Sequence, residues 1–539
     1  MYAGLFIGAV VFFAICYVFY GRFQARVYGL SEDNKPPSEL YFDGVDYVPA
    51  HPAVLLGHHF ASIAGAGPIV GPIAAANLFG WLPTYLWCLI GSAFLGGVHD
   101  MGALVSSMRH KGLSVGEVVD KWIGRKGKRL FLTFTWLALT LVIAVFLELS
   151  ASTFAADPAV AFSGTLYIFM AMIFGVLIYK RGVSLSVVTV VMVPIVIGAV
   201  FFASGNEWVQ STFALSKNTW RLILTVYIFF ASVLPVWLLL QPRDYLASYM
   251  LYFSVLLGAI GMIFGSKFEV NLPAFKGVNP TEGVYLWPML FVIVACGAIS
   301  GFHSLVGSGT TSKQLRKETD AKLVGYGSML LEGVVAVIAI GTVMMAGGIL
   351  KGGPTVTYGK GLGQFASLIG INPKVGTSLG LLALNSFLLT SLDTATRLAR
   401  YQFQEFFDMK INRYVATAIG VGVALVLLYY KTGGTPAWKL IWPVFGASNQ
   451  LVAALALLAL AVWVKLGLKK NNAFAMYPFF FMIATTMAAL FFLIKANIKN
   501  PLLAGISILL VILAVMLIKE AKDALSGHGP SAGESNAAE

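Results

Sequence analysis

Residues 58–72 read HHFASIAGAGPIVGP, and they lie inside an apolar segment that we place at 52–75. Roughly 20 apolar residues cross a bilayer as a helix, so this segment is long enough to span one. Yet Gly65, Gly67 and Pro68 free backbone groups in its middle. In hydrocarbon such groups are tolerated only where protein or a water-filled cavity satisfies them. The sequence therefore predicts a membrane helix that is interrupted at a binding site.

The composition extends this interpretation to the whole chain of 539 residues. Hydrophobic residues make up 58% and charged residues 11%, with a mean hydropathy of +0.80. Soluble domains carry about 25% charged residues. This excludes a soluble enzyme, a disordered chain and a nucleic-acid-binding protein, and predicts an all-α integral membrane protein. The net charge of +13 comes from basic residues between apolar segments, which is typical of membrane topology rather than of a nucleic-acid partner.

Apolar periodicity predicts about 15 transmembrane segments. They lie at 3–20, 52–75, 81–107, 130–150, 163–179, 184–204, 219–240, 249–266, 284–311, 324–350, 376–396, 412–430, 437–464, 474–494 and 500–518. Lys and Arg concentrate in the loops that are cytoplasmic if the N-terminus is outside, above all in 108–129. We therefore expect an outside N-terminus and a cytoplasmic C-terminus.

A second interruption suggests an internal repeat. The segment 219–240 contains Pro235 and ends at Gln241-Pro242. Two interrupted spans in corresponding positions are a sequence sign of a transporter site. Segments 52–204 and 205–396 then form two inverted five-helix repeats, the 5+5 arrangement of leucine-transporter-like folds. Residues 1–51 hold a preceding helix and a cytoplasmic loop, 397–518 hold about four following helices, and 519–539 form a disordered cytoplasmic tail.

Backbone donors near the interruptions are the expected substrate site. The dipole of a half-helix favours a negative charge at its N-terminus, so an anionic carboxylate is a suitable ligand. The expected substrate-binding residues are Gly65, Ala66, Gly67, Gly71, Pro235 and Gln241.

Ionisable residues inside membrane segments are costly and usually functional. His58 and His59 precede the first interruption, while Asp100 and His303 lie in other segments. An imidazole titrates near neutral pH, so these four residues are candidates for coupling to protons. The alternatives are neutral histidines bound to carbonyls, or a metal held by His58, His59, His99 and Asp100, although no metal-binding motif is present. We expect Asp100 to pair with a histidine or with Arg109.

Hydroxyls on 284–311 offer a different coupling ion. Ser300, Ser304 and Ser308 recur every four residues and so share one helix face, with Gly297 and Gly301 beside them. This face is either a close helix contact or a sodium site.

Other polar residues at membrane depth are expected to act as gates or structural links. Asp393 and Arg397 are four residues apart and can pair on one helix face. Asn449 and Gln450 follow a Gly-Ala-Ser interruption of the segment 437–464 and are expected to bridge helices. Glu148 lies near an expected membrane surface, where we expect it to be solvated.

Several motifs that are typical of enzymes and nucleotide-binding proteins are absent from the sequence. There is no phosphate-binding G-x-x-x-x-G-K-[ST], no G-x-S-x-G and no H-E-x-x-H. The three cysteines, Cys16, Cys88 and Cys296, lie in apolar stretches and match no metal or disulfide framework. We therefore expect no enzyme activity, no cofactor and no bound metal.

The chain resembles the carbon starvation protein A (CstA) family. The segment 58–72 carries the resemblance, together with GWLP at 80–83, VHD at 98–100, QPRDYL at 241–246, SGFHS at 300–304 and FGASNQL at 445–451. The resemblance covers roughly residues 1–520. It implies a bacterial inner-membrane secondary transporter of the amino acid–polyamine–organocation superfamily, which takes up peptides or pyruvate with proton coupling. It transfers no role to individual residues. A sodium-coupled carrier, a passive channel and a starvation sensor remain the alternatives.

Overall fold

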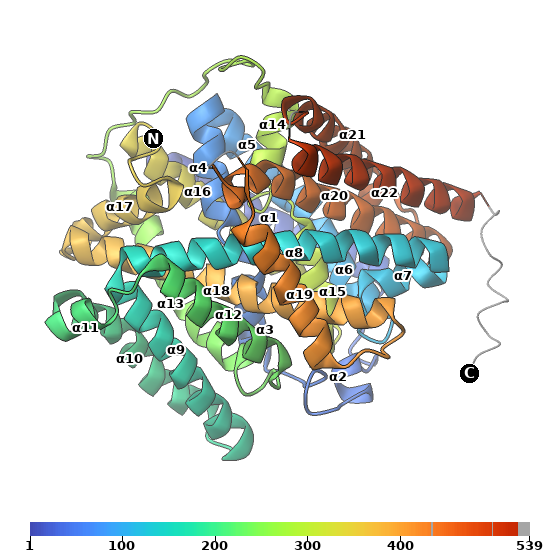
Figure 1. Ribbon diagram of the computed structural model, residues 1–539, viewed down its shortest axis with the longest axis horizontal. Coiled ribbons are helices and arrows are strands. Elements are labelled where there is room, and N and C mark those ends of the chain that lie inside the picture. The colour runs from blue at the N-terminus through green and yellow to red at the C-terminus, as the bar shows by residue number, and fades with distance from the viewer. Residues whose placement is uncertain (433–434, 499, 527–539) are drawn as a thin grey trace.

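The computed structural model describes residues 1–432, 435–498 and 500–526. The described chain is helical apart from two two-residue strands, β1 (Lys431–Thr432) and β2 (Thr435–Pro436), which pair antiparallel. Figure 1 shows the long helices α8 and α18 running side by side across the middle of the molecule. The α-helices are α1 (Tyr2–Tyr28), α2 (Pro37–Leu40), α3 (Pro52–Ala64), α4 (Gly67–Phe79), α5 (Trp81–Gly91), α6 (Gly97–Met108), α7 (Val115–Trp122), α8 (Arg125–Ala156), α9 (Pro158–Gly175), α10 (Leu185–Gly205), α11 (Glu207–Thr212), α12 (Lys217–Val233), α13 (Leu240–Phe264), α14 (Leu286–Ile293), α15 (Gly301–Gly309), α16 (Ser328–Ala346), α17 (Pro354–Ala366), α18 (Pro373–Phe406), α19 (Arg413–Tyr429), α20 (Ala437–Leu466), α21 (Ala473–Ala496) and α22 (Pro501–Leu525).

Short turns of other helix types join or extend these elements. Three are π-helical: η1 (Ser92–Gly96), η2 (Val176–Lys180) and η4 (Lys322–Gly327). Two are 3₁₀ turns, η3 (Thr311–Lys313) and η5 (Ser367–Ile369).

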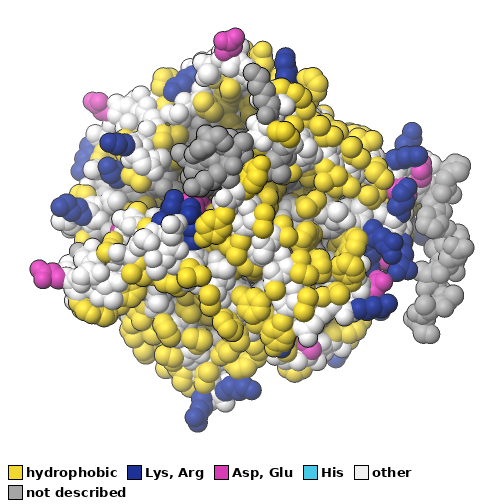
Figure 2. Space-filling model, viewed as in Figure 1, with side chains coloured by type: hydrophobic (Ala, Val, Ile, Leu, Met, Phe, Trp, Pro, Cys, Tyr) yellow, Lys and Arg dark blue, Asp and Glu magenta, His cyan; other side chains and the backbone are white. Residues whose placement is uncertain are grey.

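Among the described residues, twelve helical segments are long and apolar enough to cross a membrane. Each of the 15 predicted segments falls on helix, but those at 219–240, 284–311 and 412–430 are not among the twelve. Figure 2 shows a broad apolar surface with charged side chains mainly toward its edges. Large apolar side chains such as Phe19, Val190 and Tyr477 are more than two-thirds exposed, as lipid-facing residues are. The chain is a multi-pass membrane protein.

The predicted interruption of the first core helix is confirmed. α3 begins with Pro52 in its first turn and ends before Gly65, whose φ of +51° suits glycine far better than other residues. A Cβ on Gly65 would also lie 3.0 Å from the hydroxyl of Ser391. Ala66 then precedes α4, which has Pro68 in its first turn.

The second interruption differs from the prediction. The segment 284–311, expected as one continuous helix, breaks at residues 294–300 between α14 and α15. The region around Pro235 is instead the connection between two separate helices, α12 and α13. Leu234 is extended, because a following proline disfavours helical geometry. The N–H of Val236 then donates to the carbonyl of Val45, at 3.0 Å, which ties this connection to the loop before α3.

Two further expectations about the C-terminal part need comment. α20 runs through Gly446-Ala447-Ser448 without a break, so the expected interruption there is wrong. α22 continues to Leu525, so the first residues of the expected tail at 519–539 are helical. Residues 527–539 lie outside the described residues.

Candidate functional site

The two interruptions pack directly against each other. A Cβ on Gly67 would lie 2.2 Å from the Cβ of Cys296, and a Cβ on Gly71 would lie 2.7 Å from the carbonyl oxygen of Ile293. Any larger side chain at these two positions would collide with the opposite chain segment. The sequence GAGPIVG therefore permits a close approach between α4 and residues 293–296.

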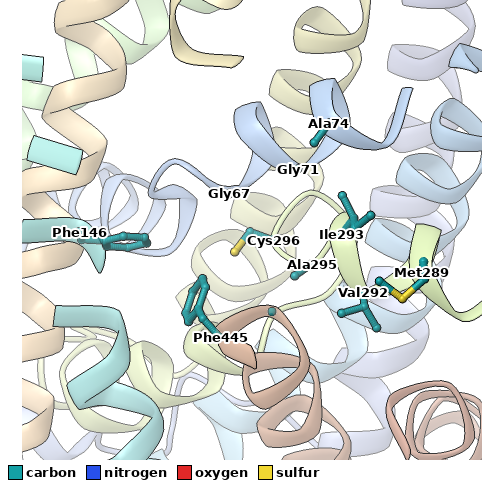
Figure 3. Close-up of a pocket in the computed structure, with 11 residues that line it drawn as sticks. Gly67, Gly71, Ala74, Phe146, Met289, Val292, Ile293, Ala295, Cys296 and Phe445 are labelled. Carbon is teal, nitrogen blue, oxygen red and sulfur yellow. The ribbon is translucent and has the colours of Figure 1, made fainter. Parts of the chain in front are cut away.

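A cavity of about 240 Å³ opens beside this contact, as Figure 3 shows. The sulfur of Cys296 and the rings of Phe146 and Phe445 surround the same space, and the two ring centroids are 6.1 Å apart. The lining is apolar, with backbone atoms as its main polar groups. It consists of Gly67, Gly71, Ala74, Phe146, Met289, Val292, Ile293, Ala295, Cys296, Phe445 and Gly446.

The predicted substrate residues divide into two groups. Gly67 and Gly71 line the cavity, and Gly65 and Ala66 form the adjoining interruption. Pro235 and Gln241 do not line it. The side chain of Gln241 instead accepts from the hydroxyl of Tyr179 and donates to the side chain of Gln314.

Two amides of α20 hold the second interruption in place. The Asn449 Oδ1 accepts from the N–H of Phe302 at 2.8 Å, and its Nδ2 donates to the Ser300 hydroxyl at 2.9 Å. The Gln450 Nε2 donates to the carbonyl of Ile299 at 3.0 Å. The predicted bridging contacts are thus confirmed, and they supply partners for backbone groups that the break leaves free.

The three serines do not form the predicted continuous face. Ser300 lies in the interruption, while Ser304 and Ser308 lie on α15. The Ser304 hydroxyl donates to the carbonyl of Gly301 at 2.7 Å. α15 begins only at Gly301, so Ser300 lies outside the helix and only Ser304 and Ser308 keep the helical spacing.

One buried charge cluster lies on the α13 side of α3, and we call it the arginine cluster. The His58 Nδ1 lies 2.7 Å from the Asp244 Oδ2. Arg243 is ion-paired with Asp393 and lies 3.6 Å from Asp244. The hydroxyl of Tyr227 also donates to Asp393. The cluster thus joins four helices, α3, α12, α13 and α18, around one guanidinium group.

The predicted pair of Asp393 with Arg397 does not form. Asp393 is bound by Arg243, whereas Arg397 lies 2.8 Å from Asp46 and donates to the carbonyl of Ala231. The reason is that each of these two side chains binds a partner from another segment instead. Arg400 also approaches Asp46, at 3.5 Å. Burial alone would raise the pKa of Asp46, but the charges of Arg397, Arg400 and Lys313 outweigh it and lower the pKa to about 2.

A second buried cluster, the histidine cluster, joins α6, α15 and α16. The Asp100 carboxylate lies 2.8 Å from the Nδ1 of His99 and 2.8 Å from the Nδ1 of His303. The Nε2 of His303 lies 3.3 Å from Glu332. All four side chains are fully buried. The predicted pairing of Asp100 with a histidine is confirmed, whereas Arg109 pairs with Glu318.

His59 faces away from the arginine cluster. Its Nδ1 lies 2.8 Å from the Thr311 hydroxyl, while His58 contacts Asp244. Adjacent residues point about 100° apart on a helix, so these two histidines contact different neighbours.

Comparison with known proteins identifies the family. The family model described as "Carbon starvation protein CstA" matches residues 2–351 and 346–489. The chain is 33% identical to the "Peptide transporter CstA" of Bacillus subtilis (strain 168), over 95% of this chain and 94% of that relative. The chain belongs to the CstA family. It is also 29% identical to the "Pyruvate/proton symporter BtsT" of Escherichia coli (strain K12), over 93% of this chain and 82% of that protein.

The solved structures that match this CstA family member have low sequence identity to it and low TM-scores. A manganese transporter of Eremococcus coleocola is 13% identical with a TM-score of 0.45, covering 90% of this chain and 99% of that one. MhsT in complex with L-phenylalanine is 15% identical with a TM-score of 0.43, covering 86% and 99%.

Sequence reasoning missed several members of the site in this CstA chain. Arg243 and Asp244 fall between the predicted segments 219–240 and 249–266, but α13 already begins at Leu240 and buries both. The signal was present, since QPRDYL leads without a turn into an apolar stretch. Glu148 was expected to be solvated, yet it is fully buried between Lys217 at 2.9 Å and Arg221 at 2.6 Å.

No group of three or more His, Cys, Asp or Glu side chains is placed to hold a metal ion within the described part of the chain.

Proposed function

We propose that this CstA family member is a secondary active transporter that takes up a small carboxylate or a peptide together with protons. The observation that carries the proposal is the meeting of two interrupted helices at a small cavity, with buried titratable clusters beside it. Interrupted helices at membrane depth are typical of transporter sites. The names of the two relatives, a peptide transporter and a pyruvate/proton symporter, support the same function.

The cavity favours a pyruvate-like carboxylate over a peptide. Its volume of about 240 Å³ is below the roughly 300–1,000 Å³ of sites for drug-sized ligands. Its lining contains no Asp or Glu that would bind the free amine of a peptide. α4 begins at Gly67, whose N–H lies at the positive end of the helix dipole and suits an anionic group. Pro68 has no N–H, and the N–H groups of Ile69 and Val70 donate to the carbonyl of Ala66. In this proposal Gly65, Ala66, Gly67 and Gly71 surround the substrate.

Protons are the coupling ion in this proposal, carried among His58, His59, Asp100 and His303. All four side chains are buried, and two of the three histidines, His58 and His303, contact a carboxylate. Sodium coupling through Ser300, Ser304 and Ser308 is the second candidate, but the interruption separates the first hydroxyl from the other two. A passive channel or a sensor would show no accumulation of substrate against a gradient.

An inverted repeat fits the direction of the two interrupted helices. Between them the chain passes through α5–α6, α8, α9, α10, α12 and α13, an even number of long segments. If each segment crosses the membrane, the two interrupted helices run in opposite directions, as an inverted repeat requires. Because the second interruption is at 294–300, the repeat boundary would lie later than the predicted 205. We place the protein in a bacterial inner membrane, with its N-terminus outside and its C-terminus in the cytoplasm.

Uptake into proteoliposomes tests the function directly. Under an inward proton gradient, we expect labelled pyruvate to accumulate more than labelled dialanine, and a protonophore to abolish the accumulation. Accumulation of dialanine alone would reverse the substrate choice. Accumulation that requires an inward sodium gradient would replace protons with sodium. Equal flux without accumulation would identify a channel.

A matched pair of variants tests whether the cavity binds the substrate. Gly67→Ala places a methyl group onto Cys296, so it should abolish uptake. Cys296→Gly removes the opposing side chain, and the double variant should recover part of the uptake. Failure of the double variant to recover, when the protein is assembled, would argue against this contact as part of the site.

A further inference from the structure

Glu332 is a buried carboxyl group without an adequate partner. It lies in the second turn of α16 and is fully buried. Neither of its oxygens has a hydrogen-bond partner among the described residues. No lysine or arginine forms an ion pair with it there, and its nearest ionisable contact is the Nε2 of His303 at 3.3 Å. An isolated carboxylate is very costly to bury, so this side chain needs a proton.

The arrangement of His303 offers a partner for that proton. Its Nδ1 contacts the Asp100 carboxylate at 2.8 Å, so Nδ1–H is the donor and Nε2 faces Glu332. One proton between the Glu332 Oε2 and the His303 Nε2 keeps that pair neutral. Loss of the proton leaves a second carboxylate close to Asp100 with no lysine or arginine to balance it. The cluster therefore has two states that differ by one proton.

The proton site is connected to the cavity through α15. His303 lies in the first turn of α15, directly after the interruption at 294–300. Cys296 of that interruption lines the cavity, and its thiol lies 3.5 Å from the Ser300 hydroxyl. A change of charge at His303 therefore acts on the segment that forms the cavity wall.

The helices that carry the two acids both contain π-helical turns. η1 precedes Asp100, and η4 precedes Glu332. α6, which follows η1, packs closely on η4: a Cβ on Gly97 would lie 2.2 Å from the ring of Tyr326, and one on Gly325 would lie 2.9 Å from the Cα of Met101. π-helical turns are frequent at functional sites, where they shift the register of the following side chains.

We propose that Glu332 binds and releases the transported proton, sharing it with the Nε2 of His303, and that α15 couples this step to the cavity. The proposal rests on the proposed function as a proton-coupled carrier. The proton enters from water on one side of the membrane and leaves to water on the other side. The other titratable groups around Glu332 are Asp100 and His99 on α6, Cys88 on α5 and Cys296 in the interruption.

The test compares driven accumulation with exchange. Exchange of internal for external labelled pyruvate needs no net proton movement, whereas accumulation does. Glu332→Gln removes the titratable proton but keeps the size of the side chain. We expect this variant to lose proton-driven accumulation and substrate-induced proton uptake, reported by a trapped pH dye. Its exchange should persist and become independent of pH between about 5 and 8.

Controls separate this role from general damage. Glu405→Gln also neutralises a buried carboxyl group, one that binds Ser114 outside the cluster, and should keep both accumulation and pH-dependent exchange. Retained accumulation and proton uptake in Glu332→Gln would overturn the proposal. If the wild-type protein itself accumulates nothing under a proton gradient, the proposed function fails instead.

A second variant covers failure of Glu332→Gln to assemble. Glu332→Asp keeps the acid but increases its distance from the His303 Nε2. We expect it to retain proton-driven accumulation and to shift the pH midpoint of exchange. An unchanged midpoint in an assembled Glu332→Asp protein would overturn the proposal.

Discussion

His58 and His59 are neighbours in the sequence, yet they lie beside buried clusters of two different kinds. On one side, the arginine cluster holds Asp244 and Asp393 around Arg243, a group that keeps its charge at any working pH. On the other side, the histidine cluster holds Asp100 and Glu332 around His303. Every member of the second cluster can gain or lose a proton.

This difference separates a structural role from a coupling role. The charge of Arg243 is permanent and favours the ionised form of the carboxylates beside it, because protonating either one would weaken its attraction to the cation. Among the described residues no lysine or arginine pairs with Asp100 or Glu332, so no permanent cation fixes their charge. The sequence shows buried acids and histidines on both sides. In the arginine cluster His58 is the member that we propose as a proton carrier, whereas in the histidine cluster Asp100, His303 and Glu332 lie close enough to share a proton.

Removing Arg243 is expected to have the largest effect. Arg243→Met leaves Asp393 and Asp244 buried without a cation, and breaking a buried ion pair typically costs about 3–5 kcal/mol. We expect little assembled protein and a large fall in melting temperature, measured in detergent by size-exclusion chromatography with heating. Arg125→Met is the matched control, because its exposed pair with Asp408 is worth about 0–1 kcal/mol.

A double variant distinguishes charge from packing in the arginine cluster. Arg243→Met with Asp393→Asn removes one of the unbalanced carboxylates, so it should be more stable than Arg243→Met alone. If the double variant is as unstable as the single one, lost packing rather than charge explains the effect. The contrast between the two clusters would then lose its basis.

Neutralising Asp100 is expected to have a smaller effect on stability and a larger one on coupling. Asp100→Asn weakens two charge-assisted hydrogen bonds from histidines but leaves no lysine or arginine unpaired. Such bonds are worth about 1.5–3 kcal/mol each, and the amide retains part of them, so we expect a loss of about 2 kcal/mol. Proton uptake on addition of substrate should fall to the level of protein-free liposomes. A variant that melts early yet couples normally would place Asp100 with the structural charges.

The sequence predicts the helical membrane fold and the first interruption because both depend on local chemistry. Gly65, Gly67 and Pro68 disfavour a continuous helix through this segment, and 58% hydrophobic residues leave no soluble alternative. The second interruption contains Gly297, with Gly301 directly after it, but no proline, so its sequence resembles a closely packed helix. Its opening depends on Asn449 and Gln450 from α20, which satisfy the freed backbone groups.

The partners of charged residues could not be predicted because they come from distant segments. The spacing of Asp393 and Arg397 allows a pair on one helix, and that is all the sequence contains. In the structure Arg243 binds Asp393 and Asp46 binds Arg397. These partners lie about 150 and 350 positions away along the chain. Only the packing of α13 and of the loop before α3 determines these partners.

Removing the charge of Asp46 is expected to have the smallest effect on stability, because this site is partly exposed to water. Its side chain is 16% exposed and is bound by Arg397 and Arg400. Its pKa of about 2 lies below the roughly 3.9 of an unfolded aspartate, so its stabilisation is complete above about pH 5 and disappears as the pH falls through 2. We expect Asp46→Asn to cost about 1–2 kcal/mol at pH 7.

A series of melting curves in detergent checks this expectation. The difference between the wild type and Asp46→Asn should shrink steadily below about pH 4, because the wild-type carboxylate becomes protonated. Glu39→Gln is the control, since Glu39 forms only an exposed pair with Lys35 and should change little at any pH. A difference that stays constant with pH would mean that Asp46 acts through its hydrogen bonds rather than its charge. Contact with arginine would then not be sufficient evidence that a carboxylate in this protein stays charged. The same series of melting curves would have to be measured for the arginine cluster around Arg243.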